Sequence, residues 1–203
     1  MSIQRKKFFT SDWHAGEVAA PQNHSFCRPR PTAEMIDEWL AECHDKIKPD
    51  DELWFVGDLG LQLANLAIYK ELPECYKVLV LGDKEYNNIN YSAQEFAREE
   101  SRLHLFDEVH RFHHVEIDGI QFFVAHKPED CMDANLPALC GHIHGIWRTQ
   151  KMNNGQPIIN VGIDAWHQLV SEELIMHQYH AVMKAYYDGN CFINLDLPFF
   201  KRG

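Results

Sequence analysis

Residues 52–58 read ELWFVGD, a largely apolar run that ends in Gly-Asp. The same pattern returns at 76–83, where the residues read YKVLVLGD. Short apolar runs of this kind, rich in Val, Leu and aromatic residues, predict buried β-strands. In α/β sheets the carboxyl ends of the strands line the ligand crevice. The two Gly-Asp pairs are therefore expected at a functional edge of a sheet.

Three further runs end in residues of the types that bind metals. KKFFT at 6–10 is followed by Ser-Asp-Trp-His, IQFFVA at 120–125 is followed by a histidine, and an apolar stretch precedes Cys-Gly-His-Ile-His-Gly at 140–145. The candidate metal ligands after the five runs are Asp12, His14, Asp58, Asp83, His126, His142 and His144. Mixed carboxylate and imidazole ligands suit Mn, Fe, Co, Ni or Zn better than Ca.

The spacing within two of these motifs also favours a shared site. In extended backbone, residues i and i+2 point to the same side. Asp12 with His14, and His142 with His144, are therefore each expected to present two ligands to one cavity. Taken singly, most of the motifs have an ordinary explanation as turns or surface residues. Their order and their common position at strand ends favour a metal site.

In that order the motifs resemble those of the calcineurin-like metallophosphoesterases, which run Asp-x-His, Gly-Asp, Gly-Asn-His, a lone His and Gly-His-x-His. The match spans Phe8 to about Asp164. The resemblance implies an α/β fold, a four-layer αββα sandwich of two mixed β-sheets flanked by helices. It also implies two divalent metal ions, of which Mn is the first expectation, with Fe, Zn, Ni or Co as alternatives.

By position, the resemblance assigns seven ligands to these two ions. The first ion would be held by Asp12, His14, Asp58 and His144. The second would be held by Asp58 as a bridge, Asp83, His126 and His142. Two such ions bind a phosphate and activate a water for in-line attack. The implied activity is hydrolysis of a phosphomonoester or phosphodiester, with Asp58 among the catalytic residues.

One motif departs from the family pattern, because Gly-Asn-His reads Gly82-Asp83-Lys84. Asp83 keeps an oxygen donor but adds a negative charge. Lys84 replaces a histidine that the family uses at the leaving group. Its ordinary pKa near 10.4 makes it a poor general acid at pH 7, yet it can place a positive charge near the leaving oxygen. The alternative is that Lys84 is solvated and that the site is impaired.

Within the family the chain is similar to a small bacterial and phage branch of phosphohydrolases. Phe26-Cys27-Arg28-Pro29, the turn at 48–51 and the segment from Asn160 to Trp166 carry this likeness. Arg28 and Arg30 are candidate phosphate contacts, since arginine suits bidentate phosphate recognition. Solvated loop charges are an equally good interpretation of both. His24 is a further candidate, in place of a Gly-His that the branch has after Asp-x-His.

The organisation of the chain fits one domain over residues 1–203. Apolar residues at helical spacing predict a helix over 33–47, and 112–125 predict a hairpin with an Asp-Gly turn. The segment from Ser171 is interpreted as a helix or as strands. Residues 191–197 predict a last strand. The first half thus alternates strand and helix, whereas the second half is richer in hairpins.

Composition narrows the expected partners. The 30 acidic and 19 basic residues give a net charge of −11, which disfavours nucleic acid and anionic lipid but allows a small phosphorylated substrate. No apolar run reaches the ~20 residues of a membrane span. The six cysteines contain no Cys-x-x-Cys pair and no export signal precedes them, so we expect reduced thiols in a cytoplasmic protein. Oligomeric state is left open.

Two other hypotheses stand beside the enzyme. The first is a catalytically impaired relative that binds metal or phosphate as an adaptor, and its support is the altered Gly82-Asp83-Lys84. The second is a structural zinc protein, which the lack of paired cysteines argues against.

Overall fold

A computed structural model describes residues 5–16, 27–28, 30, 32–60, 63–86 and 93–187. The strands are β1 (Lys7–Thr10), β2 (Glu52–Val56), β3 (Tyr76–Val80), β4 (Glu108–His110), β5 (His113–Ile117), β6 (Ile120–Val124), β7 (Ala138–Cys140), β8 (Thr149–Lys151), β9 (Pro157–Asn160) and β10 (Val170–Ser171). The helices are α2 (Thr32–Lys46), the 3-10 helix η1 (Leu63–Glu71), α3 (Asp83–Tyr86), α4 (Ala93–Leu103), α5 (Pro128–Cys131), α6 (Ile163–Trp166) and α7 (Glu172–Tyr187).

The strands form two mixed sheets of five strands each. The first has the order β10-β1-β2-β3-β4, in which β1 to β4 are parallel and β10 is antiparallel to β1. The second has the order β5-β6-β7-β9-β8, in which β6, β7 and β9 are parallel and the two outer strands are antiparallel. Because β1, β2 and β3 are parallel neighbours, their carboxyl ends meet at one edge, as do those of β6 and β7.

Alternating side chains of the first sheet enter two different cores. Phe9, Trp54 and Val78 face the second sheet and meet its Val115 and Phe122. The intervening residues of β1 to β3 face the opposite way and pack with apolar residues of α2, η1 and α4. Burial on both faces explains why these strands read as nearly continuous apolar runs.

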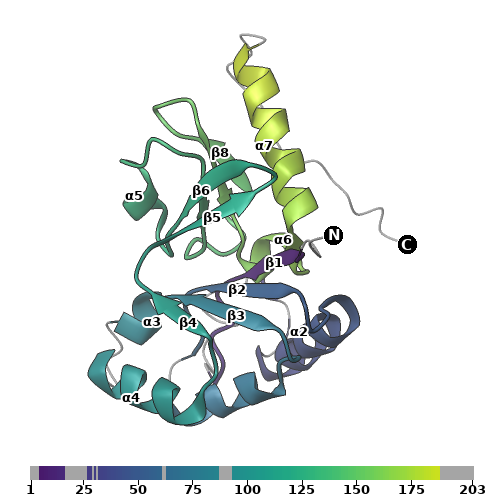
Figure 1. Cartoon of the computed structure of the whole chain (residues 1–203), viewed down its shortest axis with the longest axis vertical. Helices are drawn as coiled ribbons and strands as arrows, with labels where there is room; N and C mark the ends of the chain where they lie inside the picture. The colour runs from purple at the N-terminus through teal and green to yellow at the C-terminus, as the bar shows by residue number, and fades with distance from the viewer. Residues whose placement is uncertain are drawn as a thin grey trace.

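The layers are visible in Figure 1, where α2 and α4 lie on the face of the first sheet that is turned away from the second. The outer face of the second sheet carries a smaller core that includes Cys131 of α5. The long helix α7 packs against β9 and β10, and its Ile175 and Met176 join the core between the sheets. The predicted architecture, two mixed sheets with helices outside, is confirmed.

Most predicted elements are present at nearly the predicted bounds. The helix over 33–47 is α2, and the hairpin over 112–125 is β5 and β6, joined at Asp118-Gly119. The segment from Ser171 is the helix α7. The five cysteines within the described residues are free thiols, four of them buried. The strand predicted at 191–197 lies outside the described residues, as does His24. Within the described ranges, no helix is long and apolar enough to span a membrane.

Candidate metal centre

The seven candidate ligands lie together where strands of the two sheets end. Asp12 and His14 follow β1, and Asp58 follows β2. Asp83 opens α3, three residues beyond the end of β3, and His126 lies two residues beyond β6. The loop after β7 supplies His142 and His144. The structure thus brings together side chains that follow five different strands.

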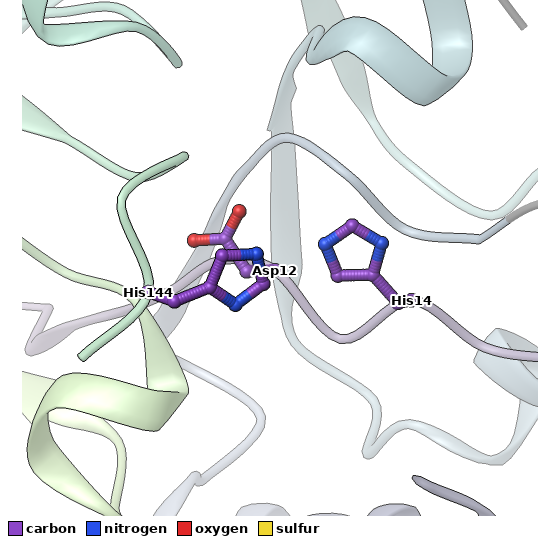
Figure 2. Close-up of side chains that lie close together, drawn as sticks. All are labelled: Asp12, His14 and His144. Carbon is purple, nitrogen blue, oxygen red and sulfur yellow. The ribbon is translucent and has the colours of Figure 1, made fainter. Parts of the chain in front are cut away.

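One group of three ligand-type side chains is almost completely buried. Asp12, His14 and His144 offer ligand atoms that all lie within 4.8 Å of one another. Figure 2 shows the carboxylate and the two imidazoles around a common space. The rings of His14 and His144 are stacked, with centroids 5.1 Å apart. The three residues are at most 7% exposed, so an ion held here would be shielded from bulk water.

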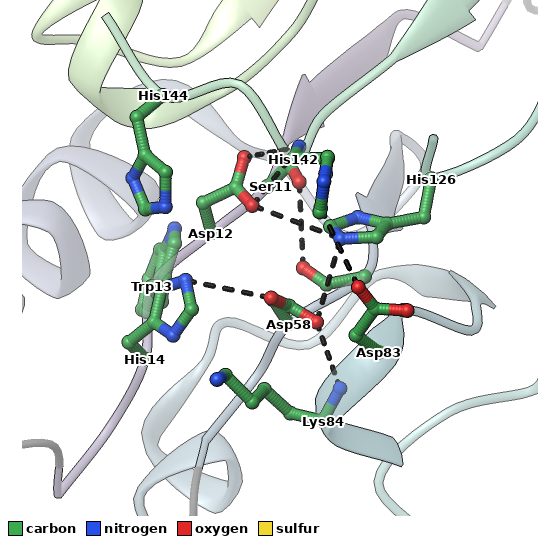
Figure 3. Close-up of polar contacts among 12 residues, drawn as sticks. Ser11, Asp12, Trp13, His14, Asp58, Asp83, Lys84, His126, His142 and His144 are labelled. Carbon is green, nitrogen blue, oxygen red and sulfur yellow. Dashed lines mark hydrogen bonds and ion pairs between the residues drawn. The ribbon is translucent and has the colours of Figure 1, made fainter. Parts of the chain in front are cut away.

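A second group, Asp83, His126 and His142, lies beside the first. His142 Nδ1 is 3.6 Å from Asp83 Oδ2. Asp58 lies between the two groups, because its Oδ2 is 3.5 Å from His14 Nε2 and its Oδ1 is 3.4 Å from His126 Nε2. Figure 3 shows this central position of the Asp58 carboxylate. The Asp58 carboxylate is therefore close to both groups.

The backbone at the candidate ligands differs from the extended form assumed in the sequence analysis. Five of them have left-handed φ angles: Asp12 at 64°, His14 at 52°, Asp58 at 55°, His142 at 72° and His144 at 50°. Non-glycine residues rarely adopt this region, and such strain concentrates at functional sites. The i and i+2 argument is therefore wrong in its mechanism. His142 and His144 also separate, one in each group.

Two glycines allow the loops to approach this closely. A Cβ on Gly82 would lie 2.4 Å from the Asp58 nitrogen and 2.6 Å from its Oδ1. A Cβ on Gly141 would lie 1.9 Å from Ser11 Oγ. Neither distance is possible for real atoms, so these positions require glycine for close packing of the loops around the carboxylates.

Glu85, to which the sequence analysis gave no role, holds the Asp58 loop in place. Its carboxylate accepts hydrogen bonds from the backbone nitrogens of Asp58, Leu59 and Gly82, at 3.0, 2.7 and 2.7 Å. The side chain is buried, and burial together with the nearby Asp58 charge raises the pKa of Glu85 to about 7. Its position two residues after Asp83 was the available signal in the sequence.

Arg28 requires a correction, because it is neither a surface charge nor a group open to substrate. Its guanidinium is fully buried, and its Nε donates to both oxygens of Asp164, at 2.8 and 2.9 Å. It also donates to the backbone oxygen of Asp12. Asp164 in turn accepts a 2.5 Å hydrogen bond from His144 Nδ1. Arg28 is therefore a positioning residue behind two candidate ligands.

This chain of contacts fixes the tautomer of His144. When Nδ1 carries the proton that it donates to Asp164, Nε2 is left as the electron-pair donor of the ring. Burial alone would raise the pKa of Asp164, but the hydrogen bonds from His144 and Arg28 hold it below its ordinary value. Asp164 lies in the late segment that carried the family likeness, yet the sequence analysis assigned it no role.

Arg30 lies on the surface, away from this network. It forms a two-point ion pair with Glu38 of α2, in which the side chains are 47% and 57% exposed. The contact favours the interpretation of Arg30 as a solvated loop charge over a phosphate contact.

Two lysines approach the centre. The backbone nitrogen of Lys84 donates to Asp58 Oδ1 at 2.9 Å, and its side chain extends past Asp58 toward the side where His14 lies (Figure 3). The Lys127 ammonium is 2.7 Å from Asp83 Oδ1, and both side chains are about one-third exposed. This hydrogen bond raises the pKa of Lys127, which is therefore a cation at neutral pH.

His126 provides a direct test of whether a metal fits. Its Nδ1 lies 2.8 Å from the Val56 backbone oxygen, to which it donates, so Nε2 points toward Asp58. Nε2 is buried and has no hydrogen-bond partner within the described part of the chain. Burial would lower the pKa of His126, but the contact with Asp58 and the charge of Asp12 raise it to about 10. The same contact lowers the pKa of Asp58 against the effect of burial. The carboxylates thus attract a positive charge at this point, and the donor set fits a metal.

A cavity of about 170 Å³ adjoins the second group. Its lining includes Asp83 and His126, together with Arg111, Phe112 and Lys127. The Arg111 guanidinium lies 4.9 Å from the centre of the Phe112 ring. A larger cavity, of about 620 Å³, lies beside α7, and none of the seven candidate ligands lines it.

Comparison with solved structures supports the fold. A protein of unknown function from Aquifex aeolicus aligns over 86% of this chain and 99% of its own, with a TM-score of 0.65 and 21% identity. A novel archaeal phosphodiesterase aligns over 77% of this chain and 83% of its own, with a TM-score of 0.47 and 16% identity. Yfce, a phosphoesterase from E. coli, aligns over 77% and 79%, with a TM-score of 0.44 and 19% identity. No family model and no curated protein sequence matches the chain.

At these identities the likeness concerns the fold alone, and the two lower scores carry no weight for activity. The membership in the calcineurin-like family that the motifs suggested therefore stays a prediction.

Proposed function

We propose that this protein is a metal-dependent phosphoesterase that hydrolyses a small phosphomonoester or phosphodiester. The observation that carries the proposal is the meeting of three carboxylates and four imidazoles at strand ends of two sheets, with Asp58 between the two groups. Such a set, in which one carboxylate reaches both positions, could hold two divalent ions for phosphoester hydrolysis.

Under this proposal the first ion is held by Asp12, His14, Asp58 and His144, and the second by Asp58, Asp83, His126 and His142. The bound ions would supply Lewis-acid charge and a nucleophilic water of lowered pKa. Mn²⁺ is the expected occupant, and Fe, Zn, Ni or Co are compatible with the same donors.

The protein's own groups set the orientation and charge of the centre. The Val56 backbone oxygen and the Asp164 carboxylate keep the donor nitrogens of His126 and His144 directed inward. Three carboxylates and two divalent ions leave a net charge of about +1, and the Lys127 ammonium beside Asp83 brings it to about +2. A phosphate dianion is attracted by that charge, although the protein as a whole is acidic.

Lys84 is our candidate for stabilising the leaving group. Its backbone is fixed to Asp58, and a cation in this position favours the departing oxygen without transferring a proton. Esters with good leaving groups, such as aryl phosphodiesters, should therefore be cleaved far faster than alkyl esters. Equal rates on the two classes would remove this role from Lys84.

The rest of the substrate fits the cavity beside the second group. Arg111 and Lys127 offer positive charge there, and Phe112, which is 38% exposed, offers an aromatic face. These side chains suit a phosphorylated compound of limited size. Arg111→Gln should raise KM more than it lowers kcat, since Arg111 is not among the proposed ligands.

The test is hydrolysis of bis-p-nitrophenyl phosphate and p-nitrophenyl phosphate by metal-stripped protein titrated with Mn²⁺. We expect turnover that requires the metal, is lost in His142→Ala and is kept in His114→Ala, a matched surface histidine. The ratio of the two rates separates diesterase from monoesterase. Bound metal without turnover on either ester would refute the proposal and favour the metal-binding adaptor.

A further inference from the structure

A second cluster of metal-ligating side chains lies outside the candidate centre, where the chain passes from the first sheet to the second. Glu108 and His110 belong to β4, the outer strand of the first sheet, and His113 opens β5, the outer strand of the second. The ligand atoms of the three residues lie within 4.8 Å of one another. We propose that Glu108, His110 and His113 form a separate metal site, suited to Zn²⁺. The proposal is independent of the hydrolytic function.

Both imidazoles approach the same carboxylate oxygen. His110 Nε2 lies 2.7 Å from Glu108 Oε2, and His113 Nε2 lies 3.6 Å from it. Two ligands of a tetrahedral zinc ion with bonds of 2.0–2.2 Å are about 3.3–3.6 Å apart. The His113 contact already has this spacing, and the His110 contact needs to open by less than about 1 Å. Each ring would then bind through Nε2 and keep its proton on Nδ1.

Three contacts order these side chains in the absence of an ion. His110 and His113 stack with centroids 4.0 Å apart and planes 7° from parallel. Trp54 of β2 stacks on His113, with centroids 5.3 Å apart. Tyr76 donates a 2.5 Å hydrogen bond to Glu108 Oε1, which fixes the carboxylate and leaves Oε2 toward the rings. Because the lone pair of a ring nitrogen lies in the plane of the ring, two parallel stacked rings do not both direct Nε2 at one ion. Binding therefore requires one of the two rings to turn out of the stack.

The protonation of these groups also suits a metal. Burial and the neighbouring His110 lower the pKa of His113, which favours the neutral imidazole that binds metals. The hydrogen bond from Tyr76 lowers the pKa of Glu108, which keeps the carboxylate ionised. The three side chains are 31–37% exposed, so a water can complete a four-coordinate site.

The place of this cluster suggests what a bound ion would do. Arg111 and Phe112 lie between His110 and His113 in the chain, and both line the cavity beside Asp83 and His126. The backbone nitrogen of Leu81, which precedes Gly82-Asp83, donates to the His110 oxygen at 2.8 Å. An ion at the cluster would therefore join the outer strands of the two sheets and fix the turn that carries Arg111 and Phe112.

The experiment is equilibrium dialysis of the full chain against Zn²⁺, followed by elemental analysis. The wild type is compared with the double variant His110→Gln, His113→Gln and with His114→Gln, whose ring contacts Phe123 instead. We expect the double variant to bind one Zn²⁺ per chain fewer than the other two. Equal metal content in all three proteins would overturn the proposal, whatever the candidate centre holds.

If circular dichroism shows that the double variant folds poorly, a second variant keeps the test decisive. Glu108→Gln preserves the shape of the side chain and an oxygen for Tyr76 but removes the charge. We expect it to weaken the binding of this Zn²⁺ by more than about tenfold. Unchanged affinity in Glu108→Gln would contradict the assignment of Glu108 as a ligand and with it the site.

Discussion

Lys127 and Asp83 form an ion pair, with the ammonium nitrogen 2.7 Å from Asp83 Oδ1, at the edge of the candidate metal centre. Asp83 stands where the family that the motifs resemble has an asparagine. The pairing means that the extra negative charge of Asp83 is balanced by a cation from the neighbouring loop. Asp83 and Lys127 are then parts of one electrostatic arrangement.

Removing the cation of this pair should change metal binding and turnover in opposite directions. In Lys127→Met, Asp83 is released from its ion pair, so the affinity for the second Mn²⁺ should rise. The centre also loses one positive charge, so kcat/KM should fall by about tenfold, a modest effect because the pair is partly exposed to solvent. Calorimetric Mn²⁺ titration and steady-state rates check the two effects.

Lys127→Arg is the control, since it keeps the charge. It should stay within about threefold of the wild type in kcat/KM. If Lys127→Met matched the wild type in both quantities, the ion pair would have no part in the site.

The two arginines of the first loop should differ sharply in their effect on stability. Arg28→Met leaves the buried Asp164 carboxylate without its guanidinium, and breaking a buried pair costs about 3–5 kcal/mol. Arg30→Met removes an exposed pair with Glu38 and should leave the urea midpoint unchanged. Unfolding of the metal-free proteins in urea gives both values. Equal midpoints for the two variants would contradict the buried network.

Arg28 illustrates which part of the site the sequence could not predict. Its partner Asp164 lies 136 residues away, and a Pro-flanked arginine in a polar loop reads as a surface charge. The pairing of Lys127 with Asp83 is equally non-local. Contacts of this kind depend on tertiary packing, which no local pattern of residues records.

The fold and the positions of the candidate ligands along the chain were easier to predict from the sequence. Apolar runs such as 52–56 and 76–80 predicted the strands. The polar residue that follows each run was predicted to lie at the edge of the sheet where the strands end. The strands β4 (EVH) and β8 (TQK) were missed because they contain no apolar run, whereas β7 (ALC), of the same length, is wholly apolar. The left-handed backbone at Asp12 and His142 could not be predicted from the sequence either, because neither residue type requires it.

Metal binding at neutral pH should release protons. In the metal-free protein the pKa of His126 is raised to about 10, so the ring is protonated at pH 7.5 and an ion has to displace that proton. Calorimetry in two buffers with different ionisation enthalpies measures the release. His126→Gln should release about one proton fewer. An identical proton count in the variant would show that His126 is neutral or is not a ligand.

The same raised pKa predicts how the stability of the metal-free protein depends on pH. A folded-state pKa above the ordinary 6.5 means that protonated His126 stabilises the folded state. This contribution is fully present below about pH 6.5 and is lost as the pH rises toward 10. Urea unfolding at pH 6 and pH 10 should therefore show a smaller pH dependence in His126→Gln than in the wild type. A dependence that is the same in both proteins would argue against the ion pair with Asp58.

A methyl group at Gly82 should displace the central carboxylate. The Cβ of Gly82→Ala would lie within 2.6 Å of both the nitrogen and the Oδ1 of Asp58, so the loop must move. We expect loss of Mn²⁺ binding at both positions. Gly119→Ala is the control, because a Cβ at this hairpin turn meets open space. Its only expected effect is the strain of a φ of 78°, which should cost about 1 kcal/mol of stability. Mn²⁺ binding retained in Gly82→Ala would show that Asp58 does not bridge the two ions.

The most direct test of the account is a crystal structure of the protein grown with Mn²⁺, with diffraction data collected at a wavelength where manganese scatters anomalously. We predict two strong anomalous peaks at the strand ends, one contacting Asp12, His14 and His144 and the other contacting Asp83, His126 and His142, with Asp58 touching both. A single peak, or peaks that avoid Asp58, would contradict a two-metal hydrolytic centre.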